Sequence, residues 1–351
     1  MRFRRMLAAL VGVAAISAAV ASAPAALAAP ANYTVGWGSQ AVIPGVGGSS
    51  DAPALTDCYE GNYDGVYMMW KGAGSDQRLF FNKMDVHGNW GNQVALPFGG
   101  SSTEPSIACG NNLLMAVWKG IGTDERIFYS ISSDGGATWT PQEVVDGAPE
   151  TDLTPTVDWL PGAGIEPYLV WKGVGSDDQV YYSAWDGAWS TAGVVPGAAT
   201  DTPPRATYHI GGFGVVWKGL GSPNFWMQRL GDAGWDTTAT MIVADGGSST
   251  LPGLTGGGPG GGPLMVWKGV GTDQRVFYTS GAANCGDATL PQCWNPQQLD
   301  PTVGGTSGGP DVAEVYLQPP NAAPYSAAVL VWKGAGSDQR LFYSIGALPQ
   351  S

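Results

Sequence analysis

The sequence of 351 residues is poor in charged side chains and above all in basic ones. Lysine and arginine together number 16, against 29 aspartates and glutamates, and the formal net charge is −13. A surface this acidic repels nucleic acid and anionic membranes, so neither is an expected partner. The only two histidines, His87 and His209, lack the spacing of metal ligands, and we expect neither a metal nor a cofactor.

Long apolar segments are also scarce, with one exception at the N-terminus. Three arginines among the first five residues precede an apolar run over residues 6–20, and Ala26-Leu27-Ala28 offers a small-residue cleavage site. This pattern is typical of a bacterial secretory signal peptide over residues 1–28, and the apolar run is short for a membrane anchor. We therefore expect a secreted, extracellular bacterial protein without membrane insertion. Cleavage would leave 13 basic residues against 29 acidic ones and a net charge of −16.

Cysteine is rare as well, and four cysteines in an exported chain favour disulfide bonds. Cys285 and Cys293 bracket a short insertion, and we expect a local bond between them. Cys58 and Cys109 occupy similar places in successive repeats of the chain, so a bond between them depends on how neighbouring repeats pack. A zinc site is the alternative interpretation, but histidines with ligand spacing are missing.

Glycine, tryptophan and one repeated motif are abundant instead. The chain has 54 glycines and 15 tryptophans, and the stretch from Trp118 to Arg126, W-K-G-I-G-T-D-E-R, recurs in near copies along its whole length. The six Trp-Lys-Gly triplets begin at Trp70, Trp118, Trp171, Trp217, Trp267 and Trp332. Their spacings of 46 to 65 residues are typical of propeller blades or a similar array.

Each repeat is interpreted as a small antiparallel sheet. The apolar run before a triplet, such as Leu113 to Val117, suits a strand buried on both faces, and the β-prone run after it, such as Arg126 to Ile131, suits its partner. The intervening glycines, Ser or Thr, and Asp are the residues of a tight hairpin turn. One further strand on each side gives four strands, here named a to d in chain order, which together make a propeller blade.

The two ends of the chain predict how the ring closes. The last repeat stops after strand c at Leu348, whereas a segment around Trp37 has the features of a strand d that precedes every b strand. The sequence therefore predicts an all-β protein, a single six-bladed β-propeller of four-stranded antiparallel blades over residues 29–351, with the ring closed by the N-terminal strand. We expect a monomer.

A second motif occurs between strands c and d of the second repeat. Ser132, Asp134, Gly136, Thr138 and Trp139 spell S-x-D-x-G-x-T-W, which resembles the Asp box of the sialidase superfamily and stands where that family has it. The motif serves structure, because the Asp accepts hydrogen bonds from turn amides, the Gly adopts a conformation that other residues avoid, and the Trp packs beneath the hairpin. The resemblance implies a lectin-like propeller fold and is not evidence of catalysis.

Candidate site residues lie at the tips of the b–c hairpins. In propellers that resemble this one, ligands bind on the face that carries the b–c and d–a loops, and each tip supplies donors and acceptors that suit sugar hydroxyls. The candidates are Lys71, Asp76 and Arg78; Lys119, Asp124 and Arg126; Lys172 and Asp177; Lys268, Asp273 and Arg275; and Lys333, Asp338 and Arg340. The alternative for this set is a network of inter-blade ion pairs and turn caps. Gln179 replaces the arginine in the third tip, and Pro223 and Phe225 replace Asp and Arg in the fourth.

Three function classes remain from the sequence. The first is a secreted, non-catalytic, lectin-like propeller that binds glycans or polysaccharide through repeated weak sites whose effects add by avidity. The second is a sialidase-like glycoside hydrolase, although no R-I-P motif occurs and only Arg205 and Arg229 lie outside the repeated motif of the mature chain. Its candidate carboxylates are Glu104, Glu150 and Asp152. The third is a protein-interaction scaffold at the cell surface.

Overall fold

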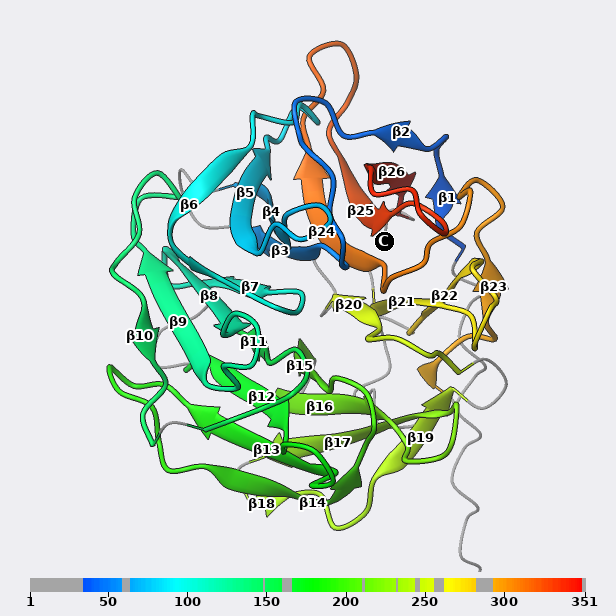
Figure 1. Ribbon diagram of the computed structural model, residues 1–351. Helices are drawn as coiled ribbons and strands as arrows, with labels where there is room; N and C mark the ends of the chain where they lie inside the picture. Colours follow the sequence, from blue (N-terminus) through cyan, green and yellow to red (C-terminus); the bar gives the residue numbers. More distant parts are fainter. Residues whose placement is uncertain are drawn as a thin grey trace, which may run out of the picture.

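The computed structural model describes residues 34–58, 64–147, 149–159, 166–209, 212–231, 233–243, 247–255, 262–281 and 293–348. Within these ranges the strands form six antiparallel sheets that radiate from a common centre (Figure 1). The same ranges contain no helix with the length and apolar character needed to cross a membrane. The chain is therefore an all-β, six-bladed propeller, as predicted.

Blades I, II, III and V each take four consecutive strands in the order a, b, c, d. Blade I consists of β3 (Ala54–Cys58), β4 (Gly65–Lys71), β5 (Arg78–Met84) and β6 (Val94–Gly100). Blade II consists of β7 (Ser106–Gly110), β8 (Leu113–Lys119), β9 (Ile127–Ser132) and β10 (Glu143–Val144). Blade III consists of β11 (Thr156–Asp158), β12 (Tyr168–Lys172), β13 (Gln179–Ala184) and β14 (Gly193–Ala199).

The second half of the ring repeats this order with small variations. Blade IV consists of β15 (Arg205–His209), β16 (Gly212–Lys218) and β17 (Phe225–Gly231), whose outer edge pairs with both β18 (Gly234–Trp235) and β19 (Thr240–Val243). Blade V consists of β20 (Gly253–Thr255), β21 (Leu264–Lys268), β22 (Val276–Ser280) and β23 (Gln298–Leu299). Blade VI consists of β24 (Asp311–Leu317), β25 (Tyr325–Lys333) and β26 (Leu341–Ala347), completed from the N-terminus.

The N-terminal segment closes the ring, which confirms the prediction from the sequence. Two short strands, β1 (Gly36–Trp37) and β2 (Ala41–Val42), pair with β26, and the register places Trp37 opposite Gly346 and Val42 opposite Phe342. Figure 1 shows these first strands lying beside the last strand of the chain. The edge of β26 is thereby covered, so no long unpaired strand edge remains in blade VI.

Apolar side chains between neighbouring blades form the core. Six clusters of buried side chains occur, and each joins two successive blades around the ring. Strand β8 shows why, because Leu114, Ala116 and Trp118 contact blade I while Met115 and Val117 contact blade III. A strand alternates its side chains between two faces, so an unbroken apolar run is what a strand buried on both faces requires.

The repeated tryptophans belong to this core. The exposed fraction of each is between 0 and 3%, for Trp70, Trp118, Trp171, Trp217, Trp267 and Trp332. Each faces the preceding blade, as Trp118 does when it stacks on Phe98 of β6 with ring centroids 4.7 Å apart. Trp therefore fills the space between blades, and it is not an exposed platform for a ligand.

Side chains of the inner strands link successive blades near the axis. The backbone N–H of Val157 donates to Ser106 Oγ at 3.1 Å, and that of Ala206 donates to Thr156 Oγ1 at 2.9 Å. The backbone N–H of Tyr208 likewise donates to a carboxylate oxygen of Asp158 at 2.6 Å. These bonds satisfy edge amides that no neighbouring strand reaches.

A disulfide bond joins two of these inner strands. Cys58 at the end of β3 is bonded to Cys109 on β7, with the two Cα atoms 5.6 Å apart, so the bond connects blades I and II. Cys285 lies outside the described residues, and its predicted bond with Cys293 stays a prediction.

The S-x-D-x-G-x-T-W residues form the turn between β9 and β10. Asp134 Oδ1 accepts the Thr138 backbone N–H at 2.8 Å, and the Trp139 indole N–H donates to the Gly136 carbonyl at 3.2 Å. The Gly136 N–H donates to Ser132 Oγ at 2.9 Å. Gly136 has φ +88°, and a Cβ there would lie 2.3 Å from the Phe81 ring of blade I, so only glycine fits. The motif thus shapes a turn and its contact with the neighbouring blade.

Candidate functional site

All six Trp-Lys-Gly motifs end a b strand and open a hairpin turn, here called the tip, and five of the six turns have the same hydrogen bonds. The blade IV tip is one residue shorter, so Ser222 and Asn224 take the positions of Asp and Arg there, and the interpretation that Pro223 and Phe225 do so was wrong. In blade II, the Asp124 backbone N–H donates to the Ile121 carbonyl at 3.0 Å, and Asp124 Oδ1 accepts the Arg126 backbone N–H at 3.1 Å. Gly122 has φ +59°, and a Cβ on Gly120 would lie 2.7 Å from the Asp124 side chain. The motif residues are therefore first of all the ones that this turn geometry demands.

The four arginines lie on the surface of their own tips. Arg126 donates to both carboxylate oxygens of Asp124, from Nε at 2.9 Å and from Nη2 at 2.7 Å, and its guanidinium stands 5.2 Å from the Phe128 ring centroid. The side chains are 50–69% exposed in the four copies Arg78, Arg126, Arg275 and Arg340. These ion pairs are thus formed within one loop, whereas the structural alternative assumed pairs between blades.

The arginines also perturb the acidity of their partners. A hydrogen bond from the Arg340 guanidinium lowers the pKa of Asp338 to about 2, and the pKa values of Asp76, Asp124 and Asp273 are lowered by the same arrangement. Each carboxylate therefore stays ionised and each guanidinium stays paired over the whole neutral range.

The lysines behave differently, because they are buried. The exposed fraction of each is between 3 and 9%, for Lys71, Lys119, Lys172, Lys268 and Lys333. Lys119 Nζ donates to Ser102 Oγ at 2.9 Å and to the carbonyls of Gly122 at 3.3 Å and Asp124 at 3.1 Å. Ser102 belongs to the crossing that leads from β6 into β7. The lysine therefore joins the tip of a blade to the d–a crossing that enters the same blade.

Tips also contact their neighbours through backbone amides. Gln77 of the blade I tip accepts the Ser101 N–H at its carbonyl, at 2.8 Å, and the Gly122 N–H of the blade II tip at its side-chain oxygen, at 3.0 Å. Gln339 makes the corresponding side-chain contact from blade VI to Gly74 at 2.9 Å. The face that carries the tips is thus held together by a polar network in which Gln takes a part that the sequence did not reveal.

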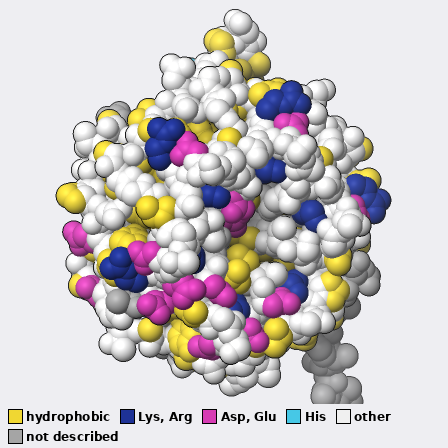
Figure 2. All heavy atoms as spheres, viewed as in Figure 1, with side chains coloured by type: hydrophobic (Ala, Val, Ile, Leu, Met, Phe, Trp, Pro, Cys, Tyr) yellow, Lys and Arg dark blue, Asp and Glu magenta, His cyan; other side chains and the backbone are white. Residues whose placement is uncertain are grey.

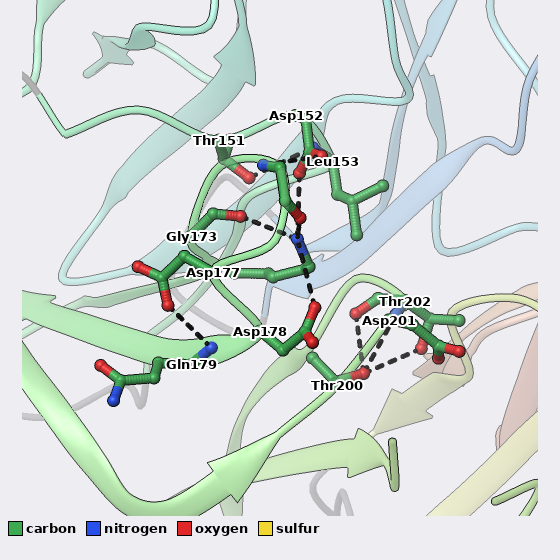
Figure 3. Close-up of polar contacts among 12 residues, drawn as sticks. Thr151, Asp152, Leu153, Gly173, Asp177, Asp178, Gln179, Thr200, Asp201 and Thr202 are labelled. Carbon is green, nitrogen blue, oxygen red and sulfur yellow. Dashed lines mark hydrogen bonds and ion pairs between the residues drawn. The ribbon is translucent and has the colours of Figure 1, made fainter. Parts of the chain in front are cut away.

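Blades III and IV carry additional carboxylates on this face. Asp152 replaces the crossing serine, and its Oδ1 lies 3.4 Å from Lys172 Nζ while its Oδ2 accepts the Gly175 N–H at 3.1 Å. Asp178 lies 3.8 Å from the same ammonium, and Figure 3 shows both carboxylates directed to one point beside Gly173. Figure 2 shows the arginine and aspartate pairs spread around the upper and lateral parts of the face, and acidic side chains gathered below, over blades III and IV.

A pocket of about 580 Å³ opens between blades II and III. Blade II and its crossing contribute Val145, Asp146, Gly147, Pro149 and Glu150; the blade III tip contributes Trp171, Gly173, Val174 and Asp177; β13 and the turn after it contribute Tyr181, Ser183, Trp189, Ser190, Thr191 and Ala192. Aromatic rings, hydroxyls and carboxylates thus meet in one concave site of the size that small ligands occupy.

The interface that holds the pocket is packed differently from the interface between blades I and II. Between blades I and II, Phe98 stacks on the repeated tryptophan of the next blade at an interplanar angle of 8°. The stretch of blade II that follows β10, residues 145–150, has no aromatic side chain, and Gly147 has φ +78°. Trp171 stacks on Tyr181 of its own blade, with centroids 5.8 Å apart. Space that a phenylalanine ring fills in blade I is therefore left open here.

The replacement of arginine by Gln179 shapes the outer wall of the pocket. Tyr181 stands where four of the other blades have a phenylalanine, and its hydroxyl donates to Asp177 Oδ2 at 2.8 Å, which raises the pKa of Tyr181. On the opposite wall, Asp146 accepts the Trp189 backbone N–H at 3.0 Å. The pocket therefore has polar groups held in place by the fold and no guanidinium over the aromatic ring.

A second group of charges lies at the centre of the ring. Arg205 Nη2 donates to both oxygens of Asp311 at 2.9 and 3.1 Å, and these side chains are only 11% and 3% exposed. Burial raises the pKa of nearby Glu104 well above its usual range, with further contributions from the charges of Asp51 and Asp311. The cavity beside these groups measures about 10 Å³, so a sugar ring does not fit there.

The structure places the three candidate hydrolytic carboxylates in different surroundings. Glu104 lies in the central cluster, Glu150 lines the pocket between blades II and III, and Asp152 is bonded to Lys172. Arg205 pairs with Asp311, and Arg229 lies 3.8 Å from Asp236 in blade IV. Each arginine of the part of the chain that the structure describes thus has its own carboxylate, and no three arginines converge on one point.

Sequence reasoning missed the pocket between blades II and III. Of its lining residues, only Asp177 belongs to the predicted ligand set, and Glu150 to the candidate carboxylates. One signal was visible, namely Gln179 in place of arginine. Its meaning depends on how blade II packs against blade III, which the sequence does not show.

Comparisons with known proteins support the fold. No family model matches the sequence, and no curated protein does. A protein of unknown function from Dyadobacter fermentans is similar in structure, with a TM-score of 0.64 and 14% identity over 90% of this chain and 99% of that one. A fungal lectin from Aleuria aurantia, described as a six-bladed β-propeller with a novel fucose recognition mode, has a TM-score of 0.57 and 11% identity over 86% of this chain and 96% of its own.

A subtype N11 neuraminidase-like protein of A/flat-faced bat/Peru/033/2010 (H18N11) is also similar in structure. Its TM-score is 0.53, with 10% identity over 90% of this chain and 96% of that protein. At such low identities the likeness concerns the backbone arrangement and not the residues of a site. What these comparisons establish is that the chain is a six-bladed propeller whose structural neighbours include a fucose lectin and a neuraminidase-like protein.

Proposed function

We propose that the protein is a secreted, non-catalytic, carbohydrate-binding propeller and that the pocket between blades II and III is its principal site. The observation that carries this proposal is the combination of aromatic rings with hydroxyls and carboxylates in a cavity of about 580 Å³. Most small-ligand sites are concave, largely apolar pockets with a few placed polar groups, and this one has that composition.

The residues of the pocket suit the two kinds of surface that a sugar presents. The partly exposed ring of Tyr181, backed by Trp171, offers an apolar face for the C–H groups of a pyranose. Asp146 and Glu150 on one side, and the Thr191 hydroxyl on the other, offer acceptors and a donor for its hydroxyl groups. One sugar unit can therefore meet both surfaces at once.

The charges of this chain favour binding over hydrolysis. The Aleuria aurantia lectin is described as a fucose-recognising propeller, and the shared fold makes a lectin function plausible for this chain. The neuraminidase-like neighbour makes hydrolysis the competing function, but here the arginines are paired one by one and the candidate carboxylates lie apart. The disulfide between Cys58 and Cys109 is compatible with export.

The exposed tips form a second, weaker set of sites in this proposal. Arg78, Arg126, Arg275 and Arg340, with their aspartates, present guanidinium edges and carboxylates around one face of the ring. Each tip alone would bind a sugar weakly, and binding to a glycan-coated surface would gain from several contacts at once. The fourth tip, with Ser222 and Asn224 in place of Asp and Arg, would not take part.

The test is a glycan-array screen followed by calorimetry with a pocket-filling variant. Ala192 is exposed at the pocket, so Ala192→Trp would occupy the cavity without removing a buried contact. Ala323→Trp, in the exposed turn between β24 and β25 on the opposite face, is the matched control. We expect Ala192→Trp to lose binding of the array hit and Ala323→Trp to keep it, with both variants folded. Equal binding by the two variants would exclude the pocket, and the absence of any glycan hit would favour the scaffold function.

A further inference from the structure

The pocket between blades II and III lies on the tip face, between the blade II tip, whose Arg126 is bonded to Asp124, and the blade III tip, which has no arginine. The arginine pairs belong to blades I, II, V and VI, whereas Gln179 and Asn224 occupy the corresponding positions in blades III and IV. The tip lysines of blades III and IV are Lys172 and Lys218, whose side chains are 4% and 11% exposed and contact nearby carboxylates. The arginines of blade IV, Arg205 and Arg229, lie beside Asp311 and Asp236. Figure 2 shows the resulting accumulation of acidic side chains over these blades.

Three carboxylates line the pocket itself, Asp146, Glu150 and Asp177. Asp146 accepts a backbone N–H, and Asp177 accepts a backbone N–H and the Tyr181 hydroxyl, so their bonds are to neutral donors. Across the residues that the structure describes, none of the three has a basic nitrogen within 4 Å. Glu150 influences Arg126, but that guanidinium is already bonded to Asp124. The negative charge of the pocket is therefore not neutralised within the protein.

The aromatic wall adds to the preference for a cation. Tyr181 and Trp171 stack, and no guanidinium covers the outer side of Tyr181, in contrast to Phe80, Phe128, Phe277 and Phe342, each of which has an arginine 5.1–5.3 Å from its centroid. In four blades the protein thus supplies its own cation to the ring at this position. In blade III the ring and the carboxylates are left to a cation from a ligand.

We propose that the pocket prefers sugars that carry a free, protonated amino group, such as the glucosamine units of a deacetylated polysaccharide, and rejects sugars that carry a carboxylate. This inference rests on the proposed carbohydrate-binding function and specifies its ligand class. An ammonium group gains attraction from the three carboxylates and from the ring, whereas a uronic or sialic acid meets like charges without a compensating cation.

The expected size of the preference is modest, because the carboxylates are partly exposed. Exposed ion pairs each contribute little, so two or three of them together correspond to about tenfold tighter binding of the amino sugar than of its neutral N-acetylated form. The preference should shrink as salt is added, since screening weakens interactions between exposed charges.

The experiment compares three tetrasaccharides by calorimetry, namely the tetramer of glucosamine, the tetramer of N-acetylglucosamine and a tetramer of galacturonic acid, at pH 6. Glu150→Gln and Asp146→Asn remove charge from the pocket and keep side-chain size. Asp186→Asn is the matched control, because Asp186 is exposed in the turn after β13 and does not line the pocket. We expect the glucosamine tetramer to bind most tightly, both pocket variants to reduce its advantage, and the control to leave it unchanged.

The outcomes separate this inference from the proposed function. Equal or tighter binding of the N-acetylated or acidic tetramer, in a manner that Ala192→Trp abolishes, would overturn the ligand class and leave carbohydrate binding intact. An advantage of the glucosamine tetramer that Asp186→Asn weakens as much as Glu150→Gln would also overturn it, since general surface charge would then be the cause. No binding of any tetramer and no array hit would reject both proposals together.

Discussion

The most informative single comparison is between Lys119→Met and Arg126→Met, two substitutions in the same tip. Both remove one positive charge and keep an unbranched side chain of similar length. Lys119 is 4% exposed and donates to three oxygens, whereas the Arg126 side chain is 50% exposed and bonded to one carboxylate. The two variants therefore test whether the repeated motif stabilises the fold through its lysine or through its arginine.

The expected magnitudes follow from burial. Hydrogen bonds from a charged donor contribute about 1.5–3 kcal/mol each, but water reaches part of the tip and methionine gains from burial, so Lys119→Met should lower the free energy of unfolding by about 2–4 kcal/mol. The exposed pair of Arg126 and Asp124, with its cation–π contact to Phe128, should contribute much less, because water screens it.

The measurement is the midpoint of guanidinium-induced unfolding, followed by tryptophan fluorescence and checked by thermal melting. We expect a clearly lower midpoint for Lys119→Met and little change for Arg126→Met. If Arg126→Met were the more damaging substitution, or if both left the midpoint unchanged, the assignment of lysine to structure and arginine to the surface would be wrong. A greater loss from Arg126→Met would argue that the tips are stabilised as ion-pair networks.

Three further predictions concern the disulfide, the central cluster and the tips. Replacing Cys58 and Cys109 by Ala removes a bond that closes a loop of 51 residues. Calorimetry should therefore show a free energy of unfolding lower by about 4 kcal/mol and a melting temperature lower by about 8 °C, and an unchanged melting temperature would contradict this. Burial raises the pKa of Glu104, so the folded state holds this proton more tightly than the unfolded state, and stability should fall as pH rises above the ordinary value of 4.5. Glu104→Gln should make the melting temperature depend less on pH between 4.5 and 7, with a residual slope from the raised pKa values of Asp158 and Asp311. An unchanged pH profile would show that Glu104 is not the cause. Changing Arg78, Arg126, Arg275 and Arg340 together to Ala should leave the protein folded, because all four are exposed, and should weaken its retention on a glycan-bearing matrix; full retention would assign the arginines to structure alone.

The sequence by itself determined the class of fold, the number of blades and the closure of the ring. These features follow from local chemistry, because each blade carries its own glycine turn, its own apolar b strand and its own tip, as Leu113 to Arg126 do in blade II. The unpaired segment around Trp37 then had one free edge to complete, that of β26. The secretory peptide over residues 1–28 and the bond between Cys285 and Cys293 stay predictions.

The tertiary structure alone decided which repeated residues face solvent and where a pocket opens. Lys119 and Arg126 are both basic residues of one motif, yet the d–a crossing with Ser102 buries one of them and leaves the other exposed. The pair of Arg205 and Asp311 joins blades IV and VI across 106 residues of sequence, and no local sequence pattern predicts it. How much space remains beside a buried tryptophan depends on which side chain of the preceding blade packs against it, and these contacts exist only after the blades have packed.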